Sequence, residues 1–123
     1  MTAIRDIEKA EAAFAKTGSD VIRRHIFICA EPQKGECCSP EKGQAAWKYL
    51  KKRLKQLGLD GSGGVARTKA DCLRICHAGP VAVVWPDGVW YHSCDEDVLE
   101  TIIQRHLIGG EPVEEYRLHA PSR

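Results

Sequence analysis

The stretch Cys72–Tyr91, CLRICHAGPVAVVWPDGVWY, combines two cysteines with two β-rich runs, and it decides the fold class. The runs Val81–Trp85 and Val89–His92 are rich in β-branched and aromatic residues, which favour strands. Between them, Pro86-Asp87-Gly88 is typical of a tight turn. This part of the sequence therefore predicts a β-hairpin.

Helical and β patterns flank this stretch. We expect an amphipathic helix over residues 2–16, a buried strand over Val21–Ile28 that runs into Cys29, a helix over about 40–57 with Ser39 as N-cap, a short strand over Val65–Lys69, and a final helix capped by Asp95. One side of the final helix should be lined by Val98, Leu99, Ile102, Ile103 and His106. A strand, a helix and a second strand in succession favour a parallel pair at the centre of a sheet, so we predict a layered α/β or α+β domain.

The composition is that of one globular domain. The chain has 123 residues, of which 43% are hydrophobic and 28% charged, and its 18 basic and 17 acidic side chains nearly cancel. These values argue against disorder and against a nucleic-acid partner held by bulk charge. The longest mostly apolar stretch, Ala78–Pro86, is too short for a membrane helix, and the N-terminus lacks the apolar core of a secretory signal. We therefore expect a cytoplasmic protein with no membrane partner.

The cysteines are the candidates for chemistry, and they stand at positions 29, 37, 38, 72, 76 and 94. In a reducing compartment, clustered cysteines are more often metal ligands or redox catalysts than disulfides. On a helical turn, Cys72 and Cys76 would project from one face. With Cys29 and Cys38 they give four thiolates from two loops near one sheet edge, which suits either tetrahedral zinc or a two-iron cluster.

Three blocks of the sequence resemble the thioredoxin-like 2Fe-2S ferredoxin family, which is similar to the small iron-sulfur subunit of respiratory NADH dehydrogenases. The blocks are His25-Ile-Phe-Ile-Cys29, Glu36-Cys37-Cys38, and Asp71–Pro80 followed by the hairpin, and the match spans roughly residues 24–112. The resemblance implies an α/β thioredoxin-like fold, with a mixed central sheet and helices packed on it. It also implies a 2Fe-2S cluster that carries single electrons, redox protein partners and a homodimer.

The resemblance also implies a ligand set. Carried over by position, the first, third and fourth cysteines of the family fall on Cys29, Cys72 and Cys76. The second falls on Cys38, with Cys37 as its possible substitute, because both stand just ahead of the 40–57 helix. A thiolate at a helix N-terminus is stabilised by about 0.3–1 kcal/mol.

Two neighbouring residues are not expected to be ligands. Cys94 follows the hairpin with no partner at ligand spacing, which indicates a free thiol. His77 is a single histidine beside Cys76, whereas Rieske centres use two histidines on one iron.

We divide the chain into an N-terminal helical extension (1–22), a 2Fe-2S ferredoxin domain (23–112) and a C-terminal tail (113–123). The predicted function is that of an electron carrier, which is not an enzyme in isolation. Two alternatives stay open: a structural zinc-binding interaction module, and a thioredoxin-like thiol oxidoreductase that uses Cys37 and Cys38 or Cys94. A bridge between adjacent cysteines strains the backbone, which weakens the second alternative.

Two further groups of side chains suggest surfaces. Trp85, Trp90 and Tyr91 of the hairpin are expected in the core or in a dimer contact. The Lys/Arg-rich side of the 40–57 helix is expected to be solvated, with recruitment of an acidic redox partner as the alternative.

Overall fold

The computed structural model describes residues 3–30, 39–75 and 77–121. Its elements follow one another as α1 (Ile4–Thr17), η1 (Ser19–Val21), β1 (Arg24–Cys29), α2 (Pro40–Gln56), β2 (Val65–Ala70), β3 (Ala82–Trp85), β4 (Val89–Tyr91), α3 (Glu96–Ile102), η2 (Ile103–Ile108) and η3 (Glu114–Tyr116). None of the helices within these ranges has the length and apolar character needed to cross a lipid bilayer.

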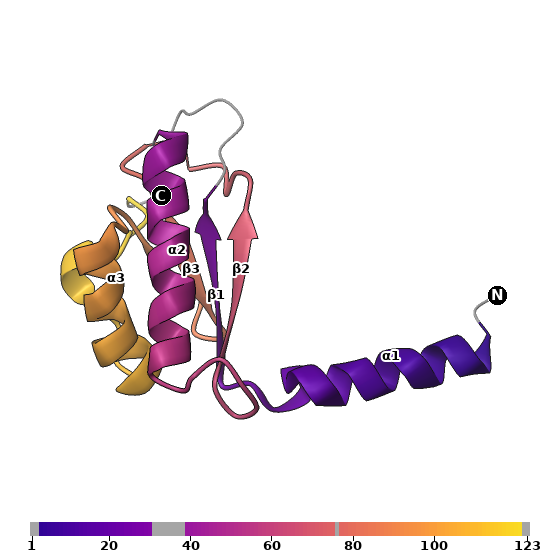
Figure 1. Ribbon diagram of the computed structural model, residues 1–123. Helices are drawn as coiled ribbons and strands as arrows, with labels where there is room; N and C mark the ends of the chain where they lie inside the picture. Colours follow the sequence, from indigo (N-terminus) through magenta and orange to yellow (C-terminus); the bar gives the residue numbers. More distant parts are fainter. Residues whose placement is uncertain (1–2, 31–38, 76, 122–123) are drawn as a thin grey trace.

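Four strands form one mixed sheet in the order β2-β1-β3-β4. β1 and β2 run parallel, with Arg24 opposite Val65 and Cys29 opposite Ala70, whereas β3 is antiparallel to both of its neighbours. The predicted parallel pair is therefore present, with β2 at an edge of the sheet rather than at its centre. α2 forms the crossover between these strands, and it lies with α3 on one face of the sheet (Figure 1).

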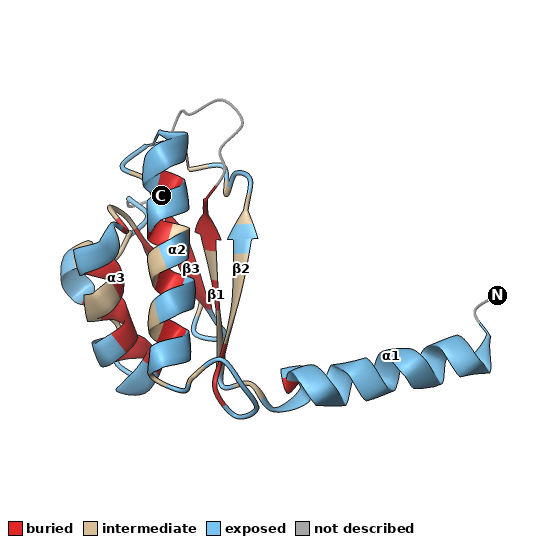
Figure 2. Cartoon of the chain, in the orientation of Figure 1, coloured by how far each residue is buried: buried red, intermediate tan, exposed pale blue. Residues whose placement is uncertain are grey.

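The hydrophobic core fills the space between the sheet and these two helices (Figure 2). Ile26 and Ile28 of β1 meet Leu50 and Leu54 of α2 there, and all four side chains are fully buried. The residues expected on the inner side of the final helix are also buried, namely Val98, Leu99, Ile102, Ile103 and His106. The helix continues past α3 into the wider π-helical turns of η2.

Local signals predicted most elements within one or two residues. Ser39 caps α2 by accepting the N–H of Lys42, and Asp95 caps α3 in the same way. The first strand is the exception, because the prediction began it at Val21 and β1 begins at Arg24. Val21 ends the short helix η1, and the ladder with Val65 starts only at Arg24, so the partner strands set the length of β1.

A series of hydrogen bonds crosses the core from Tyr91, which stands opposite Ala82, to Asp87 in the hairpin turn, at the end of the sheet where β1 begins. Val113 N–H donates to Tyr91 Oη at 2.9 Å, and Tyr91 Oη lies 2.7 Å from His106 Nδ1. His106 Nε2 lies 2.6 Å from a carboxylate oxygen of Asp87, which also accepts from Arg24 Nε at 3.0 Å. Because a carboxylate only accepts, Nε2 is the donor. These hydrogen bonds link the hairpin turn to the last helix, to the C-terminal segment and to the start of β1.

α1 projects from the body of the domain at that same end of the sheet (Figure 1). None of its residues is buried, and Figure 2 shows it exposed along its length. Ile4, Ile7 and Phe14 are exposed on it by 75%, 45% and 52%, so its apolar side chains contribute nothing to the core.

The first turns of α2 pack directly on the end of β1 at Gly43. A Cβ atom built at this glycine would lie 2.4 Å from the carbonyl oxygen of Ala30, the residue that follows β1. The absence of a side chain therefore sets how closely the start of the helix approaches the strand.

A second contact joins α2 to α3 on the outside of the core. Glu100 accepts hydrogen bonds from Tyr49 Oη at 2.6 Å and from Arg53 Nε at 2.8 Å. The hydrogen bond from Arg53 is the main reason that the pKa of Glu100 falls to about 2, and burial together with Glu100 raises the pKa of Tyr49 to about 12.

We expect Gly43→Ala to lower the free energy of unfolding by about 1–3 kcal/mol, because the added methyl group overlaps the Ala30 carbonyl. Helix propensity alone predicts the opposite sign, since Ala is the better helix former by about 1 kcal/mol. Urea unfolding of the two proteins measures the difference. Gln44→Ala, at the exposed neighbouring position, should leave stability unchanged. A stabilised Gly43→Ala protein would contradict the close approach.

Glu100→Gln should lower the free energy of unfolding at neutral pH by about 1–2 kcal/mol, because Arg53 and Tyr49 lose a charged acceptor. The folded pKa lies below the ordinary value of about 4.3, so the carboxylate contributes its full stabilisation above that value. The contribution disappears as the pH falls through about 2. Urea unfolding of both proteins from neutral to strongly acidic pH tests this, with exposed Glu111→Gln as control. A stability difference independent of pH would disprove it.

Candidate functional site

Two of the predicted ligand cysteines lie at the same end of the sheet, where β1 and β2 both finish. Cys29 is the last residue of β1, and it stands opposite Ala70, the last residue of β2. Cys72 follows only two residues later. Ala30 N–H donates to the Ala70 carbonyl at 3.0 Å, so the two chains stay paired up to the point where they leave the sheet. The parallel arrangement thus brings together cysteines that are far apart in sequence.

The Cys29 sulfur is held at the start of the hairpin. Cys29 is 1% exposed, and its N–H donates to the Val81 carbonyl at 3.0 Å. In return, Val81 N–H donates to Cys29 Sγ at 3.1 Å. Sulfur therefore replaces a carbonyl as the acceptor at the end of this ladder, which favours negative charge on the sulfur atom.

The surroundings of Cys72 repeat this feature at the surface. Cys72 is exposed, and Arg74 N–H donates to its Sγ at 3.2 Å. The prediction that Cys72 and Cys76 share a helical turn is wrong for the described part, because residues 71–75 form no helix. Arg74 has φ 67, a left-handed conformation in which its N–H points back to the sulfur.

Cys37, Cys38 and Cys76 lie outside the described residues, so the four-cysteine set remains a prediction. Within residues 3–30, 39–75 and 77–121, no three Cys, His, Asp or Glu side chains come together as metal ligands do. His77 is among the described residues and is exposed.

Three residues with uncommon backbone conformations surround the site. Apart from glycines, positive φ values in the described ranges occur only at Arg74, Ala78 and Ser93. Ser93 N–H donates to the Ala78 carbonyl at 2.7 Å, and Cys94 N–H donates to the Pro80 carbonyl at 2.8 Å. Such conformations cost free energy and are concentrated at functional sites, so they mark this end of the sheet independently of the cysteines.

Cys94 is a buried thiol beside the site, and its assignment as a free thiol stays a prediction. Burial raises its pKa, and a negative charge on Cys29 would raise it further, which places the two sulfur atoms within electrostatic reach of each other. Cys94 Sγ lies 3.6 Å from the His92 carbonyl. Since the thiolate is the reactive form, Cys94 is unsuited to disulfide exchange.

Sequence reasoning missed the Val81 and Arg74 donors because backbone N–H groups leave no residue signature. It also missed that Cys94 lies near Cys29, since their spacing fits no ligand pattern.

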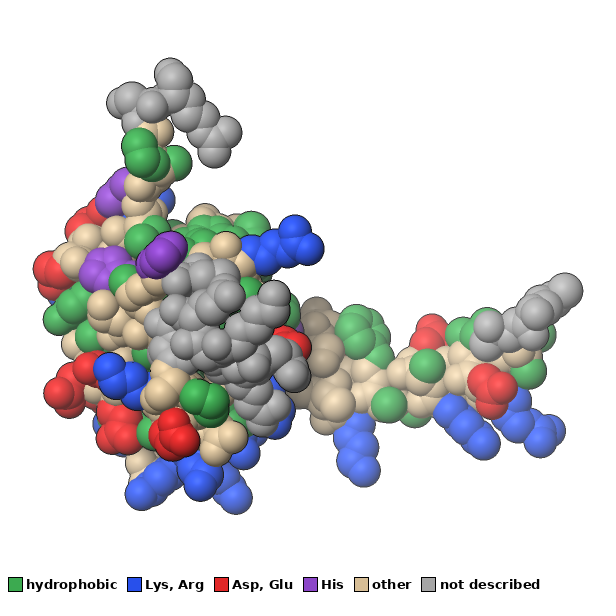
Figure 3. Space-filling model, turned by 90° about the horizontal axis from the view of Figure 1, so that it is seen from above, with side chains coloured by type: hydrophobic (Ala, Val, Ile, Leu, Met, Phe, Trp, Pro, Cys, Tyr) green, Lys and Arg blue, Asp and Glu red, His purple; other side chains and the backbone are tan. Residues whose placement is uncertain are grey.

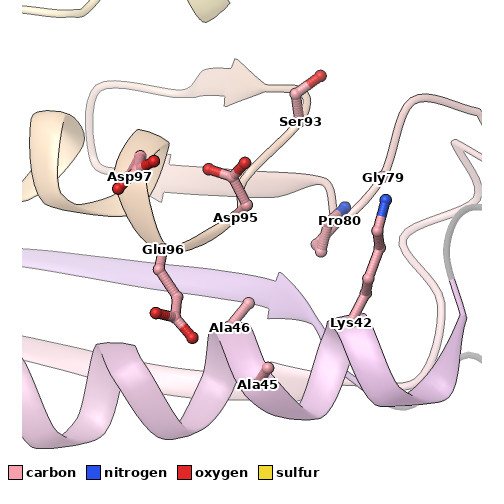
Figure 4. A pocket seen from close by; sticks show the side chains of 9 residues that line it. All are labelled: Lys42, Ala45, Ala46, Gly79, Pro80, Ser93, Asp95, Glu96 and Asp97. Carbon is pink, nitrogen blue, oxygen red and sulfur yellow. The ribbon is translucent and has the colours of Figure 1, made fainter.

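A cleft of about 370 Å³ opens beside this end of the sheet (Figure 4). Lys42 extends across it from α2 toward Pro80, and Glu96 reaches from α3 toward α2. The remaining lining residues are Ala45, Ala46, Gly79, Ser93, Asp95 and Asp97. The cleft is shallow and holds both charges, so it lacks the apolar enclosure that is typical of a small-molecule site.

Known proteins and structures share this architecture, although no protein-family model matches the chain. The chain is 31% identical over 96 residues to a 2Fe-2S ferredoxin of Aquifex aeolicus (strain VF5), a match that covers 74% of this chain and 85% of the relative. It is 30% identical over 101 residues to a 2Fe-2S ferredoxin of Clostridium pasteurianum, covering 78% and 96%.

A solved structure agrees with these relatives. The crystal structure of the wild-type thioredoxin-like [2Fe-2S] ferredoxin from Aquifex aeolicus matches with a TM-score of 0.66 and 28% sequence identity, over 79% of this chain and 97% of that one. The predicted fold class is thereby confirmed: an α/β thioredoxin-like fold with a four-stranded mixed sheet and an N-terminal helix. From the extent of these matches, the chain belongs to the thioredoxin-like 2Fe-2S ferredoxin family.

Proposed function

We propose that the protein is a one-electron carrier in which Cys29, Cys38, Cys72 and Cys76 bind a 2Fe-2S cluster, with Cys37 as the alternative second ligand. Its role is to pass electrons between protein partners rather than to convert a substrate. The observation that carries the proposal is the meeting of Cys29 and Cys72 at one sheet edge, each with a backbone N–H group directed at its sulfur.

The described residues suit such a group. Thiolate sulfur is the usual protein ligand of iron-sulfur clusters, and hydrogen bonds to the sulfur atoms help to set their potentials. When bound, the cluster supplies one-electron transfer. The N–H groups of Val81 and Arg74 offset negative charge on the ligand sulfurs and so favour the reduced state.

The two sulfur atoms differ in exposure to solvent, so the two sides of the site differ in how closely a partner can approach. Cys29 is 1% exposed and keeps its side of the site away from water, whereas Cys72 is exposed. We therefore assign the exit for electrons to the Cys72 side, where a partner approaches most closely.

Both alternative functions remain testable. A zinc module would use the same thiolates but could carry no electron. Thiol exchange through Cys94 is disfavoured because burial raises its pKa. The cytoplasmic location and the absence of nucleic-acid and membrane partners stay predictions from the sequence.

Replacing any one of the four proposed ligands by Ser should reduce the iron and acid-labile sulfide of anaerobically purified protein, because one iron loses a thiolate. It should also alter the visible absorption and the paramagnetic signal of the reduced protein. Cys94→Ser should keep both signals, and Cys37→Ser and Cys38→Ser together identify the second ligand.

Metal analysis of the wild-type protein decides between the alternatives. Iron and sulfide in equal amounts support the carrier. Zinc in their place, with no visible absorption, would establish the structural module. Protein free of metal that reduces insulin disulfides would establish the oxidoreductase.

We further propose that the protein forms a homodimer through the sheet face opposite α2 and α3. Side chains of a strand alternate between the two faces, and the core takes Ile26, Ile28, Val84 and Tyr91. The opposite face therefore carries the intervening residues, which are His25, Phe27, Ala66, Thr68, Ala70, Val83, Trp85 and Trp90.

These eight strand residues suit contact with a second copy because none of them is Asp, Glu, Lys or Arg. In a two-fold interface each surface meets its own copy, so an uncharged surface avoids self-repulsion. Burial lowers the pKa of His25, which keeps its ring uncharged near neutral pH, and that ring stacks on Phe27 with 4.1 Å between centroids. Trp85 remains 45% exposed at the end of the face and is a large apolar anchor for such a contact.

Trp85→Glu should shift the protein from dimer to monomer in sedimentation velocity, because two copies would bury like charges near each other. Phe14→Glu on α1 is the matched control, since Phe14 is 52% exposed and lies outside the sheet. It should leave the dimer intact. A wild-type protein that sediments as a monomer at high concentration would refute the dimer, as would equal effects of the two variants.

A further inference from the structure

The near-neutral net charge conceals a strong separation of charge along the chain. Residues 39–70 contain eight Lys and Arg against two Asp and Glu, whereas residues 87–121 contain two Arg against eight Asp and Glu. The basic group lies on α2 and β2, and the acidic group lies on α3 and the segments around β4, so the two groups occupy adjoining sides of the domain and meet at the contact between Arg53 and Glu100. Viewed from the cysteine end, Lys and Arg gather along the lower border of the molecule and Asp and Glu along its left border (Figure 3).

On the basic side, two cationic side chains lie over the ring of Trp47. Its ring contacts the core from α2, with Lys51 Nζ 5.6 Å from the ring centroid and the Arg67 guanidinium carbon 5.7 Å from it. Arg67 comes from β2, in which it shares the helix-facing side with Val65. A half-buried aromatic ring flanked by two cations presents both an apolar contact and positive charge at one place.

Several of the cations of this basic side have no acidic partner among the described residues. Arg53 is paired with Glu100, but within the described part of the chain Lys48, Lys51 and Lys52 form no ion pair. Arg67 Nε is buried and finds no hydrogen-bond acceptor among the described residues. A solvated lysine by itself is no evidence for a binding surface. A buried guanidinium nitrogen without an acceptor is stronger evidence, because burying it without a hydrogen bond destabilises the free protein.

We propose that this surface, the α2–β2 basic face formed by Trp47, Lys48, Lys51, Lys52 and Arg67, is where an acidic protein partner docks to exchange electrons. The electron exchange rests on the proposed function, but the docking does not. β2 leads directly from this face to Cys72, and α2 begins beside the end of β1, so a partner seated here borders the candidate site. The acidic side of the domain repels the same partner and orients it.

The partner is a protein rather than a nucleic acid because the basic residues occupy one side of a nearly neutral molecule. Sequence-independent binding of nucleic acid relies on many phosphate contacts and a large excess of positive charge. An acidic protein needs only a few matched carboxylates and an apolar contact for Trp47.

A fluorescein-labelled oligoglutamate peptide tests the docking by fluorescence anisotropy with holoprotein at low salt. The peptide should bind, and Lys48→Glu/Lys51→Glu/Lys52→Glu should weaken binding by about tenfold or more. Arg5→Glu/Lys9→Glu/Lys16→Glu is the matched control, because it reverses three exposed charges on α1 and changes the net charge equally. It should bind within about twofold of wild type.

Several outcomes would overturn the inference. These are no binding by wild type, equal weakening by both triple variants, or displacement of the peptide by duplex DNA of matched charge at a lower concentration. Cluster absorbance recorded on the same samples separates this test from that of the carrier. Protein that binds the peptide without a cluster refutes the carrier alone, and protein that holds a cluster without binding refutes the docking alone.

Oxidation of the reduced holoprotein by small ions tests whether the α2–β2 basic face serves the site. Each ferricyanide trianion or hexaamminecobalt(III) trication accepts one electron. The α2 triple variant should slow oxidation by ferricyanide and spare or speed that by hexaamminecobalt(III). The α1 triple variant should change both rates little. Equal changes for both oxidants would show that the α2–β2 basic face does not govern access.

Discussion

The parallel pairing of β1 with β2 is the constraint on which the site depends. Six residues of each strand are in register, from Arg24 opposite Val65 to Cys29 opposite Ala70. Parallel strands finish at the same end of a sheet. Cys29 and Cys72, which are separated in sequence by the whole of α2, therefore lie at the same end. An antiparallel arrangement of the same segments would place them at opposite ends. The crossover helix is therefore as much a part of the site as the thiols are.

Two local features of the backbone shape the surroundings of Cys29 and Cys72 once the sheet has placed them at the same end. Gly43 lets the start of α2 approach the end of β1, and two backbone N–H groups are directed at sulfur rather than at carbonyl oxygen. The first feature requires a residue without a side chain at position 43, whereas the second depends on main-chain donors. The printed hydrogen-bond donors to the two sulfur atoms are thus main-chain groups, so a substitution of the donor residues disturbs these bonds by moving the backbone.

The sequence predicted those parts of the fold whose signals are local. Ser39 and Asp95 cap their helices, and Pro86-Asp87-Gly88 turns between the two hairpin strands, because capping and turn formation depend on a few adjacent residues. The start of β1 was misplaced because its length depends on partner strands. The helical turn predicted for Cys72 and Cys76 was wrong for residues 71–75, where Arg74 takes a left-handed conformation and donates its N–H to the Cys72 sulfur. The basic side of α2 was visible in the sequence, but its uncompensated charge and the contact between Arg67 and Trp47 required the fold.

The hydrogen-bond chain from Val113 through Tyr91 and His106 reaches Asp87 in the hairpin turn, at the end of the sheet where β1 begins. It is built wholly from oxygen and nitrogen, whereas the opposite end relies on sulfur. The two ends therefore respond to different reagents, because acid protonates the Asp87 carboxylate whereas oxidants act on the thiols of Cys29 and Cys72. A reagent that modifies the thiols therefore leaves unchanged the hydrogen bonds that link the hairpin turn, the last helix and the start of β1.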